Sequence, residues 1–410
     1  MPKFFKFVLT TFIIINILFF SATICLADET AYVWSSLNDE IIETSAPTLS
    51  QEGNFLNLTS GSAILMEQKT GQILYEHNIH EQLRPASVTK IMTILLIMED
   101  LDSGKISLTD KVPCSDKAAS MGGSQIWLAQ NEILTVDEML KAICVVSAND
   151  CSVAMAEFLN GSEEAFVERM NQKAKELGMN DTCFKNCHGL DADGHLTSSY
   201  DIALMSKELM NNHPSITNYT KIWMDSLRNG ESSLVSTNKL LRNYEGCTGL
   251  KTGSTSTALF NLSATATRNN LSLIAVVMRG ETSKIRFEEA KKLLDYGFNN
   301  FEYVKYAKKS DLVKEIPVNK GTVDSVQIIF EEDAGSLIPK GKSNSISTNV
   351  VLADVIDAPI NSGDIIGEVQ FYIEDSILNT VKLVSKNNIK KLNLGNMFAY
   401  IIENWFNLLR

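Results

Sequence analysis

Two hydrophobic periodicities divide the region between residues 55 and 300. The alternating or short apolar pattern of β-strands occurs early, at residues 62–67 and 72–75, and late, at residues 259–267 and 271–279. Runs with the apolar spacing of helices lie between these pairs and just after them, at residues 88–98, 135–159, 163–177 and 287–298, and the second run is expected to break near Ser147. Strands at both ends with helices between them predict an α+β unit, in which helices cover one antiparallel sheet.

The pattern changes after about residue 300. Short β-rich runs follow one another without a helical period, at residues 322–330, 349–355, 365–373 and 380–384. Turn signals such as Lys340-Gly341 and Ser362-Gly363 separate them, so a small all-β domain is predicted over residues 301–385. Residues 28–54 are polar with little pattern and are predicted to be a linker.

The last segment, residues 386–410, is predicted to form an amphipathic helix. Apolar side chains recur at helical spacing from Leu392 onward, with polar residues such as Glu403 and Asn407 on the opposite side. These polar groups argue against a membrane span, because burying them in hydrocarbon is costly. Trp405 suits a lipid headgroup boundary, so we expect the helix to bind a membrane surface. A helix packed on the β domain is the alternative.

The first 27 residues have the order of a secretory signal peptide. Lys3 and Lys6 precede an apolar run at residues 7–20, and small side chains at Cys25 and Ala27 precede a cleavage site. The run is roughly 14 residues, shorter than the ~20 that a membrane-spanning helix needs. A lipoprotein signal is disfavoured because the residue before Cys25 is bulky. We therefore expect an exported protein at the outer face of the cytoplasmic membrane or in the cell-wall space.

Charge and cysteine content narrow the function further. Removing the leader takes two of the 37 basic residues and none of the 49 acidic ones, which leaves about −14 and disfavours nucleic acid as a partner. The spacing of the remaining cysteines fits no paired CxxC metal site, and no carboxylate pattern completes His77 and His80. Neither metal nor cofactor is predicted. Buried free thiols and disulfides both remain open for Cys114, Cys144, Cys151, Cys183, Cys187 and Cys247.

Three short motifs carry the chemistry, and they occur in a fixed order. They are Ser87-Val88-Thr89-Lys90, Ser147-Ala148-Asn149 and Lys251-Thr252-Gly253. Taken singly, each is more typical of ordinary structure, such as a helix cap, a loop cap or the start of a strand. Together they resemble the motif set of the penicillin-binding proteins and class A β-lactamases, which transfer acyl groups through a serine without a histidine base.

The first motif predicts a nucleophile and its base. Ser87 opens the apolar helix, and Lys90 three residues later lies on the same helix face. A serine hydroxyl is a poor nucleophile until a base assists it. Lysine acts as a base only when neutral, so the pKa of Lys90 must fall from its usual ~10.4. Burial and the nearby cation Lys251 are both expected to lower it.

The second and third motifs are predicted to bind substrate and move a proton. Ser147 is expected to relay a proton to the leaving amine, and Asn149 to donate to the substrate amide carbonyl and to hold Lys90. Gly253 has no side chain, so a substrate backbone can approach its strand closely. Lys251 and the hydroxyls of Thr252 and Ser254 are expected to receive a terminal carboxylate. The resemblance further implies that the backbone N–H groups of Ser87 and Ser254 form the oxyanion hole.

A further segment indicates which family member this is. Cys187-His188-Gly189-Leu190-Asp191 resembles the His-Gly-Leu segment of the serine-type D-Ala-D-Ala carboxypeptidases, the low-molecular-mass penicillin-binding proteins, and the resemblance covers roughly residues 55–385. It implies a β-lactamase/transpeptidase-like fold, hydrolysis of the terminal D-Ala-D-Ala bond of peptidoglycan stem peptides, and acylation of Ser87 by β-lactams. His188 is expected to pack against the site wall rather than act as a base. Lys69-Thr70-Gly71 repeats the third motif but is expected to be a structural turn.

Two other functions share parts of this pattern. A class A β-lactamase deacylates with a glutamate in a Glu-x-x-Leu-Asn loop, whereas residues 157–160 here are one residue short and too close to Ser147. A non-catalytic penicillin sensor or wall-binding scaffold would tolerate loss of Lys90 or Lys251, and both are present. Where many family members have histidine after the third motif, this chain has Ser254. Arg242 is the nearest arginine upstream of that motif.

Overall fold

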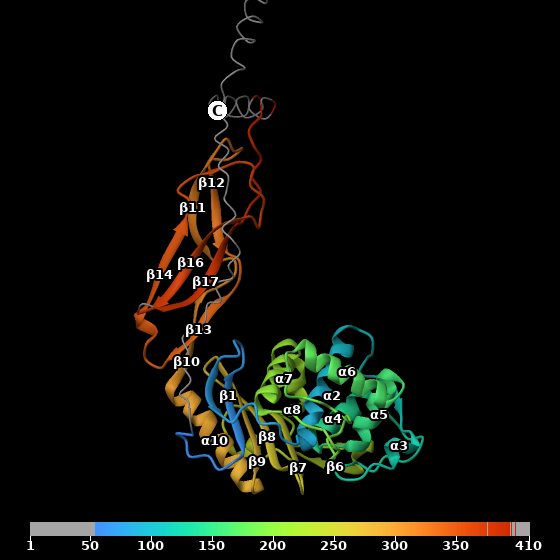
Figure 1. Cartoon of the computed structure of the whole chain (residues 1–410). Helices are drawn as coiled ribbons and strands as arrows, with labels where there is room; N and C mark the ends of the chain where they lie inside the picture. The colour runs from blue at the N-terminus through green and yellow to red at the C-terminus, as the bar shows by residue number, and fades with distance from the viewer. Residues whose placement is uncertain (1–53, 375, 394, 396–397, 399–410) are drawn as a thin grey trace, which may run out of the picture. The chain divides into compact units, whose positions relative to one another are not determined.

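The computed structural model describes residues 54–374 and 376–393, with positions 395 and 398. Its first domain contains a five-stranded antiparallel sheet in the order β2-β1-β9-β8-β7, as predicted from the paired strands at both ends of the domain (Figure 1). The strands are β1 (Ser62–Glu67), β2 (Ile73–His77), β7 (Cys247–Thr255), β8 (Leu259–Arg268) and β9 (Leu271–Gly280). Because β7 lies at one edge, its outer side is open to other parts of the chain.

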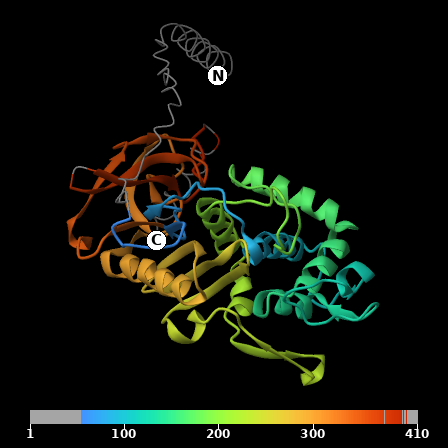
Figure 2. The same ribbon diagram turned by 60° about the horizontal axis from the view of Figure 1, so that its bottom comes forward.

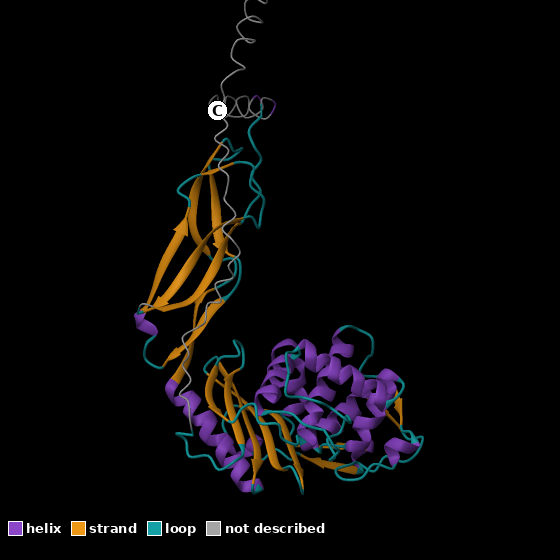
Figure 3. Ribbon diagram, in the orientation of Figure 1, coloured by secondary structure: helices purple, strands orange, loops and turns teal. Residues whose placement is uncertain are grey.

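Helices cover both faces of the sheet (Figure 3). The long helix α10 (Ser283–Asn300) packs on one face, where Ala63 and Leu65 of β1 join its core cluster. The alternate residues Ile64 and Met66 belong to the core on the other face, beneath the remaining helices. Side chains of a strand point alternately to opposite faces, so β1 contributes to two hydrophobic cores.

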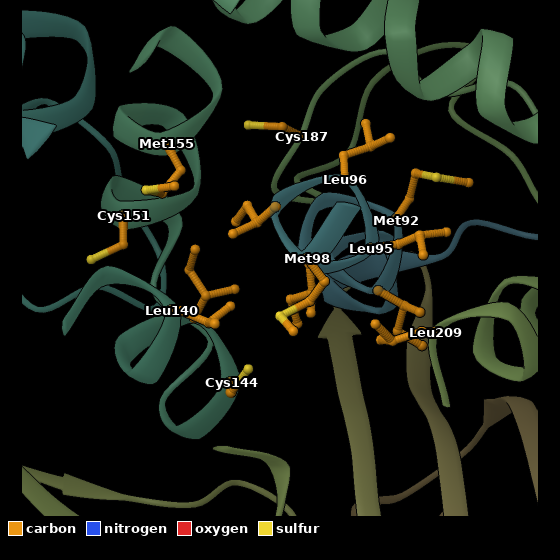
Figure 4. Close-up of a cluster of buried hydrophobic side chains, with 14 of the residues drawn as sticks. Met92, Leu95, Leu96, Met98, Leu140, Cys144, Cys151, Met155, Cys187 and Leu209 are labelled. Carbon is orange, nitrogen blue, oxygen red and sulfur yellow. The ribbon is translucent and has the colours of Figure 1, made fainter. Parts of the chain in front are cut away.

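The helical layer is built around α2 (Lys90–Asp102), which is buried on nearly all sides. Figure 4 shows Met92, Leu95 and Leu96 of this helix among side chains from its neighbours, including the thiols of Cys144 and Cys151. The other long helices of this layer are α4 (Val136–Val145), α5 (Asn149–Asn160), α6 (Glu163–Glu176) and α7 (Ser199–Asn212). A helix that is apolar all round needs such a complete covering.

The structure confirms the break predicted near Ser147 in the helical run at residues 135–159, which it divides into α4 and α5. A capping box begins α4, in which Thr135 accepts from the Glu138 N–H and the Glu138 carboxylate accepts from the Thr135 N–H. Between the helices Ser147 has a φ of 66°, a left-handed conformation that no helix interior accommodates. The break therefore places the second motif at a sharp bend.

Short elements connect these parts, and Figure 2 shows a two-stranded hairpin of β5 and β6 extending beside the main sheet. The helical connections are η1 (Ala86–Thr89), α3 (Asp116–Ala119), η2 (Pro214–Ile216), α8 (Thr217–Thr220), η3 (Arg228–Gly230) and α9 (Leu240–Asn243). The short strands are β3 (Lys111–Pro113), β4 (Ile133–Thr135), β5 (Met224–Leu227) and β6 (Ser232–Val235).

The second domain is all-β, as its sequence texture predicts. A two-stranded sheet pairs β10 (Phe301–Ala307) with β13 (Ala334–Pro339). A six-stranded sheet has the order β14-β16-β17-β12-β11-β15 around its own hydrophobic core. Its strands are β11 (Leu312–Asn319), β12 (Ser325–Phe330), β14 (Ile346–Leu352), β15 (Ile356–Asp357), β16 (Ile365–Ile373) and β17 (Ser376–Ser385).

The structure moves the predicted end of this domain. Residues 386–392 were assigned to the C-terminal helix by their sequence, but Ile389 is 2% exposed within the core of the β domain. Ile389 pairs with Ile360, and Lys391 pairs with Gly321, so this stretch is extended and belongs to the domain. The predicted leader, the linker up to residue 53 and nearly all of the predicted helix lie outside the described residues. None of the helices the structure describes combines the length and apolar character that crossing a bilayer requires.

Candidate active site

The first motif lies at the join of η1 and α2. Ser87 is half-buried in η1, and Lys90, three residues later, begins α2. The edge strand β7 passes close beside η1. A Cβ built on Gly253 would lie 2.8–2.9 Å from Val88 N and Pro85 O, closer than real side chains approach. The sequence predicts that Gly253 makes room for substrate; in the structure its missing side chain makes room for the backbone of the nucleophile.

Three groups surround the amine of Lys90, which is completely buried. Its Nζ lies 2.6 Å from Asn149 Oδ1, 2.6 Å from the carbonyl oxygen of His188 and 3.1 Å from Ser87 Oγ. Burial, and then the charge of Lys251, lower the pKa of Lys90 well below 10.5. A neutral amine has two N–H groups and one lone pair. Two donations to the oxygens of Asn149 and His188 therefore leave the lone pair for the hydroxyl of Ser87.

The second motif lies at the bend between α4 and α5. Ser147 is 3% exposed, and its Oγ has no hydrogen-bond partner among the residues that the structure describes. Buried hydroxyls normally have partners, so this group is available to a substrate or to a proton relay. Asn149 places its Oδ1 on Lys90, as expected, while its Nδ2 donates to the carbonyl of Gly122 at 2.7 Å. One N–H of the Asn149 amide remains for the predicted donation to substrate.

The third motif contributes a second buried amine. Lys251 Nζ donates to the carbonyl of Thr252 at 2.9 Å. Burial, opposed by Cys144 and assisted by the charge of Arg286, lowers the pKa of Lys251 to about 7. The hydroxyls of Thr252 and Thr237 are 2.6 Å apart, so Thr237 belongs to this cluster. Ser254, the next residue after the motif, is exposed.

An arginine that the sequence analysis missed contacts the third motif. Arg286 of α10 donates from Nη1 to the carbonyls of Gly253 (3.1 Å) and Asn261 (3.2 Å), and burial lowers its pKa to about 10. The sequence singled out Arg242, but its guanidinium lies over the ring of Trp223 at 5.4 Å. No local signal distinguishes Arg286, because it lies 33 residues after Gly253 and reaches it across the sheet.

The His-Gly-Leu segment forms a wall behind the nucleophile. Gly189 has a φ of +90°, and a Cβ there would lie 2.0 Å from the carbonyl oxygen of Ala86. The His188 ring does not reach Lys90 but lies 3.4 Å from Glu163, and burial lowers the pKa of His188 to about 4. His188 thus serves the site through its backbone carbonyl, which agrees with the predicted packing role.

The close packing at Gly189 predicts that a side chain at this position destabilises the protein. Gly189→Ala is expected to lower the free energy of unfolding by about 3 kcal/mol or more and to impair penicillin labelling, because the new methyl group displaces η1. Gly178→Ala is the matched control: Gly178 also has a positive φ, +73°, but nothing lies within 4 Å of its Cβ position. The control should lose only ~1–2 kcal/mol. Equal losses in urea unfolding for the two variants would contradict the close packing at Gly189.

The other Lys-Thr-Gly sequence, Lys69-Thr70-Gly71, is a turn. Residues 69–71 connect β1 to β2, and the carboxylate of Glu67 accepts from the N–H and the hydroxyl of Thr70. Lys69 Nζ lies 3.0 Å from the Tyr303 hydroxyl.

Within the described ranges no cluster of three or more histidine, cysteine or acidic side chains has the arrangement of a metal site. The six cysteines within the part of the chain that the structure describes are free thiols, and burial raises the pKa of Cys144 to about 12.

Comparison with known proteins identifies the class and then the family. Residues 46–282 match the family model described as D-alanyl-D-alanine carboxypeptidase, and residues 301–391 match that of the penicillin-binding protein 5 C-terminal domain. The class is therefore that of the low-molecular-mass penicillin-binding proteins. The chain belongs to the D-alanyl-D-alanine carboxypeptidase family and is a serine-type hydrolase of that specificity.

Individual relatives agree with this assignment. The carboxypeptidase DacF of Bacillus subtilis is 43% identical over 348 residues, 84% of this chain and 89% of the relative. DacA of Escherichia coli is 32% identical over 91% of this chain and 92% of its own length. Among solved structures, penicillin-binding protein 5 of Haemophilus influenzae has a TM-score of 0.72 at 32% identity, covering 82% of this chain and 98% of that one.

Proposed function

We propose that Ser87 of this carboxypeptidase attacks the carbonyl of the bond between the two terminal D-alanines of peptidoglycan stem peptides. One observation carries the assignment: the buried Lys90 amine lies 3.1 Å from Ser87 Oγ and has oxygen acceptors for both of its N–H groups. Burial and the charge of Lys251 lower the pKa of Lys90 and so favour the neutral amine, while the two acceptors orient it toward the hydroxyl, as general-base catalysis requires.

The reaction proceeds in two halves. As Ser87 Oγ bonds to the carbonyl carbon, its proton passes to Lys90, and the N–H groups of Ser87 and Ser254 stabilise the oxyanion. The C–N bond then breaks, and the departing D-alanine amine receives a proton through the unpartnered hydroxyl of Ser147. Water next attacks the acyl-enzyme, returns a proton to the site and releases the shortened peptide from Ser87.

The terminal carboxylate of the substrate binds at β7. Lys251 supplies positive charge, and the paired hydroxyls of Thr252 and Thr237 supply donors beside it. In the free enzyme the pKa of Lys251 is about 7, so the cationic form declines as the pH rises through that value. A bound carboxylate favours the charged form and raises this pKa, so carboxylate binding and protonation of Lys251 support each other.

β-Lactams acylate the same serine in this proposal. A relative of 31% identity, penicillin-binding protein D2 of Listeria monocytogenes, has been solved in an ampicillin-bound form, with a TM-score of 0.55 over 59% of this chain and 99% of that one. Deacylation as in a class A β-lactamase is disfavoured by the position of Glu157. That residue lies eight positions after Asn149 along α5, about 12 Å further along the helix axis.

The decisive test is incubation of the mature enzyme with a stem pentapeptide, followed by mass analysis. Loss of one alanine is the expected result, together with a benzylpenicillin adduct that persists for minutes. Rapid multi-turnover hydrolysis of benzylpenicillin without alanine release would favour a β-lactamase. Labelling without either turnover would favour a penicillin sensor.

The enzyme works outside the cytoplasm, held at a membrane surface. The leader predicted at residues 1–27 supports export, and the amphipathic pattern after Leu392 supports binding to lipid headgroups. Lys390 and Lys391 lie next to that segment and attract anionic lipid.

The tail prediction is tested by truncation. Deleting residues 393–410 should abolish sedimentation with anionic vesicles while peptide turnover stays within about twofold, because the described strands and core residues of both domains come before residue 393. The cut must follow Leu392, since Ile389 belongs to the β-domain core. A full-length mature protein that already fails to bind such vesicles would contradict the anchor. A deletion variant that still binds them would contradict it equally.

A further inference from the structure

One buried carboxylate outside the three motifs lies close to the base. Glu163, the first residue of α6, is 8% exposed, and four groups converge on its two oxygens. Its Oε1 accepts from Cys187 N at 3.1 Å and from Cys187 Sγ at 3.3 Å, and lies 3.4 Å from His188 Nε2. Its Oε2 lies 3.0 Å from Lys117 Nζ. Burying a carboxylate costs free energy. That this buried side chain has four partners therefore indicates a specific task.

That task concerns the peptide unit that holds the base. Lys90 donates to the carbonyl of His188 at 2.6 Å, and one residue earlier the carbonyl of Cys187 accepts from Thr93 Oγ1, also at 2.6 Å. Both donors lie on α2, three residues apart. Glu163 binds the opposite side of the same segment, through Cys187 N and the His188 ring. The Cys187-His188 segment is therefore held between α2 and α6.

The His188 carbonyl must stay in place for Lys90 to act. If the segment moved away from α2, an N–H of the amine would lose its acceptor and the lone pair would no longer be directed at Ser87. The orientation of His188 also keeps its ring out of the reaction. Its Nδ1 accepts from Leu190 N at 3.1 Å, which leaves the Nε2–H to face Glu163.

We propose that Glu163 is a positioning residue for the acyl-transfer reaction, acting on Lys90 through the Cys187-His188 segment. This inference rests on the proposed function of Ser87 and Lys90. The role depends on the reach of the side chain as a hydrogen-bond acceptor from α6 to Cys187 N. Its charge is already compensated by Lys117, which is itself partly exposed.

Two conservative substitutions separate reach from charge. Glu163→Asp keeps the charge but withdraws the carboxylate by one methylene, whereas Glu163→Gln keeps the reach and an acceptor oxygen but removes the charge. The control is Glu164→Gln: this neighbour also pairs with Lys117, at 2.8 Å, but its side chain is 75% exposed. For each variant we would measure kcat and KM on a stem pentapeptide, the acylation rate with a fluorescent penicillin, and Tm.

The expected result is a split between the variants. Glu163→Asp should lower kcat and the acylation rate ~10- to 100-fold with KM nearly unchanged, because a base displaced by a fraction of an ångström loses much of its effect. Glu163→Gln should stay within about threefold of wild type, and Glu164→Gln should equal it. A folded Glu163→Asp protein with wild-type kcat overturns the proposal, as does a Glu163→Gln protein that falls tenfold or more. If wild type itself releases no alanine, the proposed function fails instead.

Discussion

A Ser87→Ala enzyme is expected to release no D-alanine from a stem pentapeptide and to form no covalent adduct with a fluorescent penicillin. Both reactions need the bond from Ser87 Oγ to a carbonyl carbon, and the hydroxyl is the group that lies 3.1 Å from the Lys90 amine. Removing the nucleophile of an acyl-transfer enzyme typically lowers kcat by ~10⁴-fold or more. The fold should survive, because Ser87 is half-buried and its hydroxyl caps no helix.

Mass spectrometry of the intact protein after penicillin treatment checks this prediction. The control is Ser103→Ala at the other end of α2, where the exposed serine donates to the Asp100 carbonyl at 3.2 Å. That variant should label and turn over as wild type does. Labelling of Ser87→Ala at the wild-type rate would show that another residue is the nucleophile. It would contradict the role assigned to the first motif.

Replacing the base should be nearly as damaging. Lys90→Met fills a similar volume in the buried site but has no lone pair for the Ser87 proton, so we expect acylation to slow by ~10³-fold or more. In wild type, burial lowers the pKa of Lys90, so its neutral form persists well below the pH at which a free lysine is protonated. Lowering the pH through that shifted pKa protonates the amine, and wild-type acylation should fall accordingly. The residual acylation of Lys90→Met should lack this acidic decline.

Acylation rates measured between pH 5 and 9 for both proteins test this expectation. A matched control is Lys69→Met, in the second Lys-Thr-Gly sequence, whose amine contacts Tyr303 rather than Ser87. Its rate and pH profile should match wild type. If Lys90→Met keeps the acidic decline of the native enzyme, another group, such as Lys251 with its pKa of about 7, is the base.

The local pattern predicted much of the fold. The predictions of strands β1, β2, β8 and β9 and of the apolar helix after Ser87 were correct, because each depends on periodicities that neighbouring residues set. The break in the run at residues 135–159 was also predicted near Ser147, and the structure adds the left-handed φ of that residue. The extent of the β domain was predicted too short: the pairing of Ile389 with Ile360 joins residues 29 positions apart.

The site divides in the same way. Order and spacing of three motifs were enough to propose Ser87, Lys90, Ser147, Asn149 and Lys251 as its chemical groups, because spacing along one helix already places Lys90 beside Ser87. Sequence also carried the residue types that acyl transfer needs. It had no means of finding Arg286, Thr237 or Glu163, which reach the site from α10, from the segment after β6 and from α6.

The amino-acid sequence by itself therefore determined the class of chemistry, the order of secondary structure and the candidates for the reacting groups. The tertiary structure alone decided what makes those groups work. Burial of Lys90 and Lys251 lowers both pKa values, and burial is a property of packing between distant segments. The glycines show the same division: Gly189 and Gly253 are visible in the sequence, but the backbone of η1 that requires them is brought there only by folding.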